Sequence, residues 1–574
     1  MRKKWFALGC LTSIVIVVAL LFLGITSLKK LGQKKQVKIS ANSYLHLDLR
    51  GEITDYSVIK ADFFNEYQPN AHDIIQKINR AKYDDNIVGI VLEPFGVSVG
   101  YATAHEIMKA LQDFKTANKP IYAYLEMGTN KDYFLCSVAD KIIMNPSSSG
   151  GLFLTGVGSN TLFYKDLLKK IGVEVNVVQA GKFKGAGEMF SRSGMSDALR
   201  NSLTTLYADV YNQMIKTLAN NRNMPLSEMK NIYEKRDKFI VSEEYALDLN
   251  LIDDLQYKKD FYKDNVGPKD KLVPYSKYKN HKKPTMTSNI AVVYAQGNIS
   301  KKMSKLDIEK ISASRYNKIL DKLKKNKSVK AIVIRINSPG GSALESDIIY
   351  DKIQEIRKYK PVVISMGNVA ASGGYYISCA SDYIYADKFT ITGSIGVISM
   401  LPNFSELSDK IGVNSEEINY GKYTNFLNPW NKVDSNDLEQ MRYFSQKVYN
   451  EFKQRVANGR DLSLAKVEEV AQGRVWSSHD AKNIQLVDAI GNLEDAIDKA
   501  SEIANIPTYS LKFYPKQKSI TELFLEERFN LSNMSETLIK NEAKKIKVNK
   551  ALETYQLIRE YPVQMLSPIH FEDK

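Results

Sequence analysis

The sequence is poor in cysteine and histidine, the residues that most often form disulfides, bind metals or act as general bases. Only three cysteines occur in 574 residues. Cys10 lies in a long apolar run near the amino terminus, and Cys136 and Cys379 lie in apolar stretches of helical character. This number and placement exclude a disulfide framework. We predict no cofactor and no metal site.

None of the six histidines lies in a glycine-rich loop that follows a predicted strand. The best placed, His479 in Ser-Ser-His-Asp, has the surroundings of a polar helix start. A Ser-His-Asp triad is therefore not expected, and a nucleophilic serine in this chain would need a different base. The other histidines are His46, His72, His105, His281 and His570.

The charge balance is basic, but nothing else indicates a nucleic-acid partner. Lys and Arg number 80 against 65 Asp and Glu, a formal net charge of +15. The lysines lack the interleaved aromatic residues of a nucleic-acid surface, so we expect no nucleic acid to bind. A hydrophobic content of 44% and a charged content of 25% are those of globular protein. The length leaves room for several domains.

The segment from Trp5 to Leu28 contains no charged residue. As a helix it exceeds the roughly 30 Å hydrocarbon core of a bilayer. A cleaved signal peptide is the alternative, but its apolar region is shorter and ends at a small-residue cleavage site. We predict a cytoplasmic amino terminus at 1–4 and a transmembrane anchor at 5–28, although the lysines that follow do not favour an amino terminus inside.

Two similar halves follow this apolar run. Lys170-Ile-Gly-Val matches Lys410-Ile-Gly-Val at a spacing of 240 residues. Each copy alternates strand-like apolar runs with helical stretches over about two hundred residues, which is the pattern of parallel βαβ units. Further matches pair Asp140 with Asp382 and Asp253 with Asp488.

The second copy holds a serine where a predicted strand passes into a helix. The apolar run 361–365 is typical of a buried strand, and Met366-Gly-Asn-Val-Ala-Ala-Ser-Gly-Gly continues it to Ser372. The glycines let a substrate approach the backbone, and free amides at a helix start point at developing negative charge. Ser372 is the candidate nucleophile, with the Gly373 amide as an oxyanion donor. A plain turn that needs small residues is the other interpretation.

A second glycine-rich loop ends the preceding predicted strand, 331–336. The loop is Asn337-Ser-Pro-Gly-Gly-Ser, whose amides can turn outward, and Gly341 is the second candidate oxyanion donor. Such sheets place their sites at the carboxyl ends of the strands, so the two loops indicate one site. The first copy has Glu93-Pro-Phe-Gly at this place and Asn130 opposite the serine, so it lacks both features.

The first copy carries a lysine that the second copy lacks. The 240-residue spacing aligns Gly181-Lys-Phe-Lys with Gly421-Lys-Tyr-Thr, so the position of Lys184 is a threonine in the second copy. A serine in one copy and a lysine in the other indicate half-sites that meet between the copies. Without the repeat, Lys184 would be interpreted as a solvated loop lysine.

A lysine acts as a general base only in its neutral form. Its pKa of about 10.4 falls by several units when the amine is buried in a dry cleft. Lys184 would take the Ser372 proton as Oγ attacks a peptide carbonyl, and it would pass that proton to the leaving amine. Water would then release the acyl-enzyme.

Several motifs in order resemble peptidase family S49, in the long form known as signal peptide peptidase A. The resemblance covers nearly the whole chain and implies an α/β fold with two tandem crotonase-like and Clp-protease-like βαβ domains behind an N-terminal transmembrane helix. It implies a Ser-Lys dyad, carried onto Ser372 and Lys184, and a hydrogen bond from Ser394 to the lysine. A helix N-cap is the alternative role of Ser394. The motifs are the lysine segment at 180–190, Asn337-Ser-Pro-Gly-Gly-Ser, Ala370-Ala-Ser-Gly-Gly-Tyr-Tyr and Thr392-Gly-Ser-Ile-Gly.

The resemblance further implies a membrane-anchored serine endopeptidase that degrades signal peptides left in the membrane. Relatives in this family face the periplasm from the bacterial inner membrane and form homotetramers. We therefore expect peptide substrates, a lipid bilayer and further copies of the chain as partners. A single-pass inner-membrane location follows, with the catalytic part in the periplasm.

The predicted boundaries place the first S49-like repeat at 29–285 and the second at 286–506. Residues 507–574 are predicted as a helical C-terminal extension, from the helical spacing of apolar residues at 520–531. Two other classes of protein remain as alternatives. One is a crotonase-like acyl-transfer enzyme, which needs no Ser-Lys pair, and the other is a non-catalytic membrane scaffold.

Overall fold

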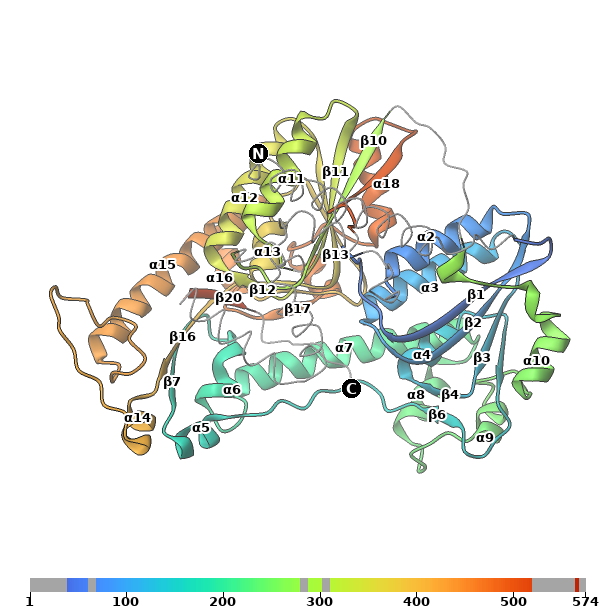
Figure 1. Cartoon of the computed structure of the whole chain (residues 1–574), viewed down its shortest axis with the longest axis horizontal. Helices are drawn as coiled ribbons and strands as arrows, with labels where there is room; N and C mark the ends of the chain where they lie inside the picture. Colours follow the sequence, from blue (N-terminus) through green and yellow to red (C-terminus); the bar gives the residue numbers. More distant parts are fainter. Residues whose placement is uncertain (1–38, 60–68, 279–287, 302–309, 519–562, 567–574) are drawn as a thin grey trace, which may run out of the picture.

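The computed structural model describes residues 39–59, 69–278, 288–301, 310–518 and 563–566. The predicted anchor at 5–28 lies outside these residues. Within the described ranges, no helix is long and apolar enough to cross a membrane. Figure 1 shows two α/β units with a sheet each, the first in blue and green and the second in yellow and orange.

The first repeat is built on a six-stranded sheet whose described pairings are all parallel. Helix α2 has the amphipathic spacing that packs on such a sheet, with Ala71, Ile74 and Ile78 buried. Asn70 caps this helix by accepting a hydrogen bond from the Asp73 amide. In sheet order the strands are β8 (Asp254–Leu255), β5 (Lys141–Met144), β3 (Ile121–Leu125), β2 (Ile87–Ser98), β1 (Ser43–Glu52) and β9 (Leu272–Pro274).

The other elements of this repeat surround the sheet or extend from it. Two short strands, β4 (Met127–Thr129) and β6 (Gly151–Phe153), pair with each other. The helices are α2 (Ala71–Lys82), α3 (Tyr101–Lys115), α4 (Asn130–Cys136), α5 (Lys165–Ile171), α6 (Glu188–Ser191), α7 (Asp197–Asn221), α8 (Leu226–Glu234), α9 (Glu243–Asp248) and α10 (Lys258–Asn265), with single 3-10 turns η1 (Gly185–Gly187), η2 (Lys269–Lys271) and η3 (Tyr275–Lys277).

The second repeat has an eight-stranded sheet with the same parallel core. Its central strands β10, β11 and β13 are buried nearly throughout, because helices cover both faces of a parallel sheet. The strand order is β17 (Val475–Ser477), β15 (Ile391–Gly393), β13 (Val362–Ala371), β11 (Val329–Ser338), β10 (Asn289–Gln296) and β19 (Ser510–Tyr514), with β14 (Tyr383–Ala386) beside β13 and β18 (Ala489–Ile490) beside β14. The helices are α11 (Ala313–Lys325), α12 (Ala343–Arg357), α13 (Gly373–Ser378), α14 (Ser405–Ile411), α15 (Ser435–Arg460), α16 (Leu464–Val470), α17 (Ser478–Asn483) and α18 (Leu493–Ile503).

Both repeats make the same side-chain contacts at matching positions, which supports their alignment. The Tyr133 hydroxyl donates to the Leu251 carbonyl at 2.9 Å, and the Tyr375 hydroxyl donates to the Leu486 carbonyl at 2.8 Å. The matched aspartates also accept equivalent bonds: Asp140 from the Ile121 amide, Asp382 from the Val362 amide, Asp253 from the Ile142 amide and Asp488 from the Ile384 amide.

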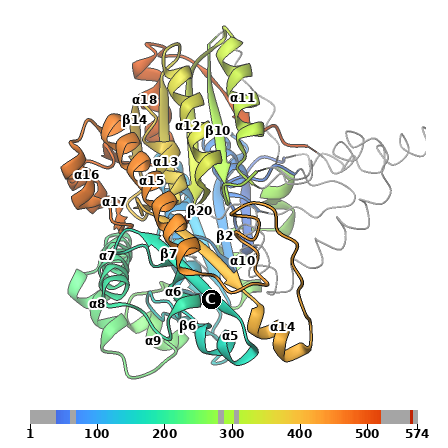
Figure 2. The ribbon, with the colours of Figure 1, turned by 90° about the vertical axis from the view of Figure 1, so that its left-hand side faces the viewer.

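The repeats are joined by strands that leave their sheets. Strand β7 (Glu174–Ala180) of the first repeat pairs antiparallel with β16 (Val397–Asn403) of the second. Figure 2 shows both strands running together toward α5 and α14. The Ala180–Val397 pair closes this ladder. The junction therefore brings the segment after β7, which carries Lys184, next to the segment before β16, which carries Ser394.

Helix α7 strengthens this contact by crossing from the first repeat to the second (Figure 1). Leu199, Leu203 and Leu206 on this helix form an apolar cluster with Ile391 of β15 and Val475 of β17. Burial of these side chains holds the first repeat against the strands that flank the predicted site.

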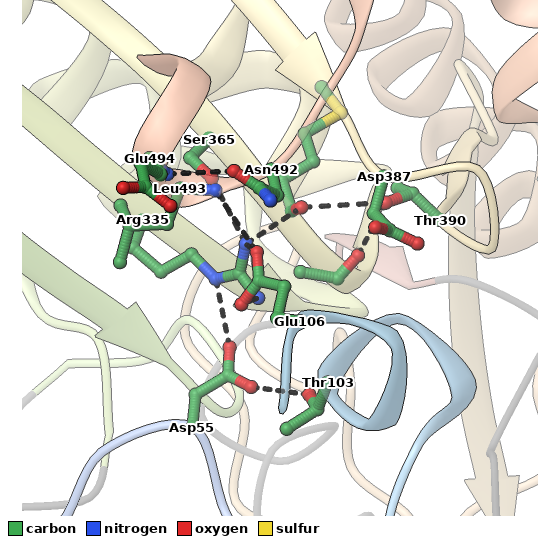
Figure 3. A network of polar contacts seen from close by, with 12 residues as sticks. Asp55, Thr103, Glu106, Arg335, Ser365, Asp387, Thr390, Asn492, Leu493 and Glu494 are labelled. Atoms are coloured by element: carbon green, nitrogen blue, oxygen red, sulfur yellow. Dashed lines mark hydrogen bonds and ion pairs between the residues drawn. The ribbon is translucent and has the colours of Figure 1, made fainter. Parts of the chain in front are cut away.

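A buried ion network also joins the repeats, as Figure 3 shows. Arg335 on β11 pairs with Glu106 of α3 at 2.7 Å and with Asp55 at 3.1 Å. Its guanidinium also donates to Ser365 Oγ at 3.0 Å and to the Met366 carbonyl at 3.1 Å, both on β13. Because β11 and β13 carry the two glycine-rich loops at their carboxyl ends, this network fixes the first repeat to the base of the predicted site.

The described parts of the predicted C-terminal extension contain two strands. Strand β19 pairs parallel with β10 at the edge of the second sheet. Strand β20 (Val563–Leu566) lies between β12 (Gly340–Ser342) and β16, antiparallel to both. Edge strands have unpaired amides and carbonyls. Pairing with these groups keeps β19 and β20 extended. The apolar stretch at 520–531 lies outside the described residues.

Candidate active site

Ser372 lies where β13 passes into α13, as the sequence predicted. Its φ of 56° and ψ of −117° belong to a region that residues with side chains rarely adopt. Its amide donates to the Gly393 carbonyl at 2.8 Å, and its carbonyl accepts from the Tyr376 amide at 2.8 Å. These bonds maintain a strained turn at the carboxyl end of the strand, which is the conformation typical of an activated nucleophile.

Lys184 follows β7 and directly precedes the turn η1, and its side chain is 0% exposed. Its Nζ lies 2.7 Å from Ser372 Oγ, 2.8 Å from the Ser394 carbonyl oxygen and 3.0 Å from Ser394 Oγ. The structure thus brings together three side chains that the sequence selected from two repeats and three motifs.

The hydrogen-bond partners of Lys184 fit a neutral amine. Burial lowers the pKa of Lys184 well below its ordinary value, because the charged form loses its hydration. A neutral amine has two N–H donors and one lone pair. The Ser394 carbonyl accepts one donor, and Ser394 Oγ accepts the other while it donates to the Gly473 carbonyl at 3.3 Å. The lone pair is then left for the Ser372 hydroxyl, as a general base requires.

The lysine loop rests on a turn of the second repeat that the sequence did not single out. The Phe183 amide donates to the Gln472 carbonyl at 2.7 Å, and the Lys182 amide donates to Gln472 Oε1 at 3.0 Å. Gly473 has a φ of 75°, and a Cβ there would lie 2.6 Å from the Lys184 Cβ. A side chain at Gly473 would displace the lysine. A single glycine in a polar stretch gave too little signal to predict this role.

The two predicted oxyanion donors lie beside each other. A Cβ on Gly373 would stand 3.2 Å from the Gly341 amide nitrogen and 2.7 Å from Ser346 Oγ. Gly341 has a φ of 147°, and a Cβ there would stand 2.0 Å from the Ile299 carbonyl oxygen. Both positions therefore require glycine, and both amides belong to the loops that meet at Ser372.

The equivalent place in the first repeat is filled by a carboxylate. Asp132 on α4 accepts hydrogen bonds from the Gly96 amide at 3.2 Å, the Val97 amide at 3.0 Å and the Thr129 amide at 2.9 Å. This carboxylate occupies the amides that an oxyanion would need, and Asn130 offers no nucleophilic oxygen. The first repeat therefore supplies a lysine to the shared site, and its described residues form no second site of the same kind.

Strand β20 is the other feature of the site that the sequence missed. It lies directly beside the oxyanion loop, with Gly341 opposite Met565. The short run Val-Gln-Met-Leu is flanked by prolines at 562 and 568, which is the available signal for a strand. The run is too short to stand out from the Lys- and Glu-rich residues before it.

The remaining candidates lie elsewhere. His479 lies in α17, behind a Ser477 cap whose Oγ accepts from the Asp480 amide, as expected for a polar helix start. Across the described ranges, no group of three or more His, Cys, Asp or Glu side chains is placed to hold a metal ion.

Comparison with known proteins gives matches over both repeats. The model of "Peptidase family S49" matches residues 113–266 and 354–507, and that of "Clp protease" matches 293–388. The chain is 32% identical over 485 residues to the serine protease SPPA, chloroplastic, of Arabidopsis thaliana, which covers 82% of this chain and 70% of that protein. It is 30% identical over 565 residues to Protease 4 of Salmonella typhi, covering 92% and 89%. It is 38% identical over 180 residues to a putative signal peptide peptidase SppA of Enterococcus faecium, covering 31% and 52%.

These matches agree with the architecture. The same family model falls once on each repeat, and the Clp protease model falls on β10, β11 and β13 of the second. The predicted α/β fold with two tandem repeats and a Clp-protease-like domain is confirmed. The chain belongs to peptidase family S49 and is a serine peptidase.

Proposed function

We propose that the chain is an endopeptidase that hydrolyses peptide bonds with a dyad of Ser372 and Lys184. The observation that carries this proposal is the 2.7 Å contact between Ser372 Oγ and a fully buried amine from the other repeat. A crotonase-like acyl-transfer enzyme needs no such pair, and a scaffold has no use for a buried lysine beside a strained serine. The contact therefore favours the peptidase over both alternatives.

The residues of the site divide the steps of the reaction between them. The Lys184 lone pair accepts the hydroxyl proton as Ser372 Oγ attacks the peptide carbonyl. The Gly341 and Gly373 amides donate to the oxyanion that forms. The protonated amine then gives its proton to the leaving nitrogen, and the same lysine activates the water that releases the acyl-enzyme. Ser394 aims the amine at the nucleophile throughout.

The strand pairing beside the site suits an extended peptide. Strands β12 and β16 lie on either side of β20, so a segment of the chain already pairs there through its main chain. Substrate peptides that add as a strand gain the same main-chain hydrogen bonds whatever their side chains. This supports peptides without fixed secondary structure as the substrate class.

We further propose that the natural substrates are signal peptides left in the bilayer after export. The protein would be held in the bacterial inner membrane by residues 5–28, face the periplasm and assemble as a homotetramer. The uncharged run at 5–28 and the similarity to a protein named putative signal peptide peptidase SppA support this proposal. An enzyme anchored beside its substrate works at a high local concentration of it.

The test uses the full-length protein in detergent and then in lipid vesicles. A fluorophosphonate probe should label Ser372, and Ser372→Ala and Lys184→Ala should each abolish hydrolysis of a fluorogenic apolar peptide. Lys182→Ala is the matched control, since this exposed lysine lies two residues away. Full activity in Lys184→Ala would refute the dyad. The signal-peptide assignment is refuted if a signal peptide embedded in the vesicles stays uncleaved while soluble peptides are cleaved.

A further inference from the structure

A short turn of the second repeat holds the loop that carries the base. This clamp turn, residues 472–474, lies between α16 and β17, and it contacts the lysine loop, residues 181–184, of the first repeat. Gln472 provides two acceptors. Its carbonyl accepts from the Phe183 amide at 2.7 Å, and its Oε1 accepts from the Lys182 amide at 3.0 Å. Both bonds use the main chain of the lysine loop, so they fix its path rather than any one of its side chains.

The backbones of the two segments touch without room for a side chain between them. A Cβ on Gly181 would stand 2.6 Å from the Gln472 carbonyl carbon. A Cβ on Gly473 would stand 2.6 Å from the Lys184 Cβ. The peptide that joins Gln472 to Gly473 is therefore enclosed between the first and last residues of the lysine loop. A shift of the clamp turn would move the base with it.

The clamp turn also holds Ser394, which accepts hydrogen bonds from the Lys184 amine. The Ser394 amide donates to the Arg474 carbonyl at 2.7 Å, and Ser394 Oγ donates to the Gly473 carbonyl at 3.3 Å. The Gly473 amide donates in turn to the Ile395 carbonyl at 2.7 Å. One turn therefore fixes both the loop that carries the amine and the residue that orients it.

The side chain of Gln472 is itself oriented by two helices of the second repeat. Its φ of 56° lies in the left-handed region, and its amide donates to Tyr449 Oη of α15 at 3.1 Å. Its Nε2 donates to Glu468 Oε1 of α16, and Glu468 pairs with Lys453 of α15 at 2.5 Å. Because the Glu468 carboxylate takes the NH₂ end of the side-chain amide, the oxygen end is directed to the Lys182 amide.

We propose that Gln472 is a positioning residue that holds the Lys184 amine within hydrogen-bond distance of Ser372 Oγ. The inference rests on the proposed peptidase function and adds the residue that places its base. Gln472 acts through the lysine loop and not on the substrate. A misplacement of about 1 Å can lower a rate by roughly 10²-fold. Loss of the Oε1 bond leaves the Phe183 bond in place, so we expect a smaller loss of about tenfold.

The experiment compares full-length wild type with Gln472→Ala. We expect kcat for a fluorogenic peptide to fall about tenfold with KM unchanged, because the base is displaced and the substrate contacts remain. A loosened loop admits water to the amine, which raises the pKa of Lys184 from its lowered value. The rise of kcat/KM with pH should therefore move to higher pH, and the loss should shrink in alkaline solution. Glu469→Ala removes an exposed carboxylate of α16, and this control should match wild type.

Two further variants separate positioning from stability. Gln472→Gly removes the same side chain, but glycine adopts a positive φ without strain, so this variant keeps the fold even if Gln472→Ala does not. Positioning predicts the same loss of kcat in both variants, whereas a structural role predicts that glycine restores activity. In a Lys184→Met background, Gln472→Ala should cause no further loss, because Gln472 acts only through the amine.

Wild-type kcat in Gln472→Gly would overturn the inference. A loss that is equal at every pH, or one that adds in full to the loss in Lys184→Met, would overturn it as well. Failure of the function itself has a different signature, because hydrolysis would then survive in Ser372→Ala. An inactive Ser372→Ala together with wild-type kinetics in both Gln472 variants would remove the inference and leave the peptidase in place.

Discussion

Replacement of Lys184 by methionine removes the amine and retains an unbranched apolar side chain in a fully buried position. Among the residues that the structure describes, the Ser372 hydroxyl then keeps no hydrogen bond to a base. A positioned base contributes roughly 10²- to 10⁴-fold, so kcat/KM should fall by that factor, or about 3–5 kcal/mol of transition-state stabilisation. The double variant with Ser372→Ala should be no less active than Ser372→Ala alone, because the two side chains act as a unit.

The same substitution should also change the pH dependence of stability, because the pKa of Lys184 is lowered in the folded chain. A lysine with an ordinary pKa would give no such change. Burial lowers the pKa of Lys184 in the folded state below the ordinary value of 10.5. Between the lowered pKa and 10.5 the unfolded chain binds one more proton than the native chain, so native stability rises with pH. The slope is at most about 1.4 kcal/mol per pH unit, and it disappears above the unfolded pKa. Lys184→Met lacks this contribution, so its stability advantage over wild type should shrink as pH rises.

Two measurements test this reasoning on the same protein samples. Urea unfolding at several pH values gives the stability difference between wild type and Lys184→Met. A pH–rate profile of wild type should show kcat/KM rising through a pKa well below 10.5. Lys182→Met, which alters an exposed neighbour, should match wild type in both. The reasoning fails if the stability difference is independent of pH between neutral and alkaline conditions, or if activity rises only near the pKa of a free lysine.

Three further predictions concern neighbouring groups. Ser372→Gly should be more stable than Ser372→Ala by about 1 kcal/mol and should unfold at a higher temperature, because glycine adopts a positive φ without strain. Equal melting temperatures would contradict the strain at this position. Ser394→Ala leaves its carbonyl in place but removes one of two acceptors for Lys184, so kcat should fall roughly tenfold with KM unchanged, and a kcat equal to wild type would contradict the positioning role. Burial raises the pKa of Glu106 to about 7, so the native chain holds the extra proton and wild type should lose stability as pH rises from 4.5 to about 7. Glu106→Gln should abolish that loss in urea titrations, and an unchanged profile would place the titrating group elsewhere.

Much of the site could be predicted because its chemistry depends on local patterns. Ser372 follows a buried run and precedes two glycines, and that local order already specifies a strand, a turn and a helix start. Lys184 was found through the repeat, because the spacing of 240 residues aligns it with a threonine in the second copy. The closeness of Gly341 to Gly373 could be predicted in the same way, since strand-end loops of parallel sheets meet at one edge.

Other parts could not be predicted, because their cause lies far away in the sequence. Gly473 must lack a side chain only because the Lys184 loop packs on it. Val563–Leu566 is extended because β12 and β16 offer main-chain partners, and its own four residues have no preference strong enough to show this.

The sequence by itself determined the two βαβ repeats, and it predicted Ser372 as the nucleophile and Lys184 as the base. These depend on periodicity, on glycine at strand ends and on the comparison of one copy with the other. Only the tertiary structure decided that the pKa of Lys184 is lowered, because the two repeats together bury its amine. It also decided that Val563–Leu566 pairs between β12 and β16, beside the loop that carries Gly341. Main-chain hydrogen bonds do not depend on residue type, so the residues of this strand could not have predicted that contact.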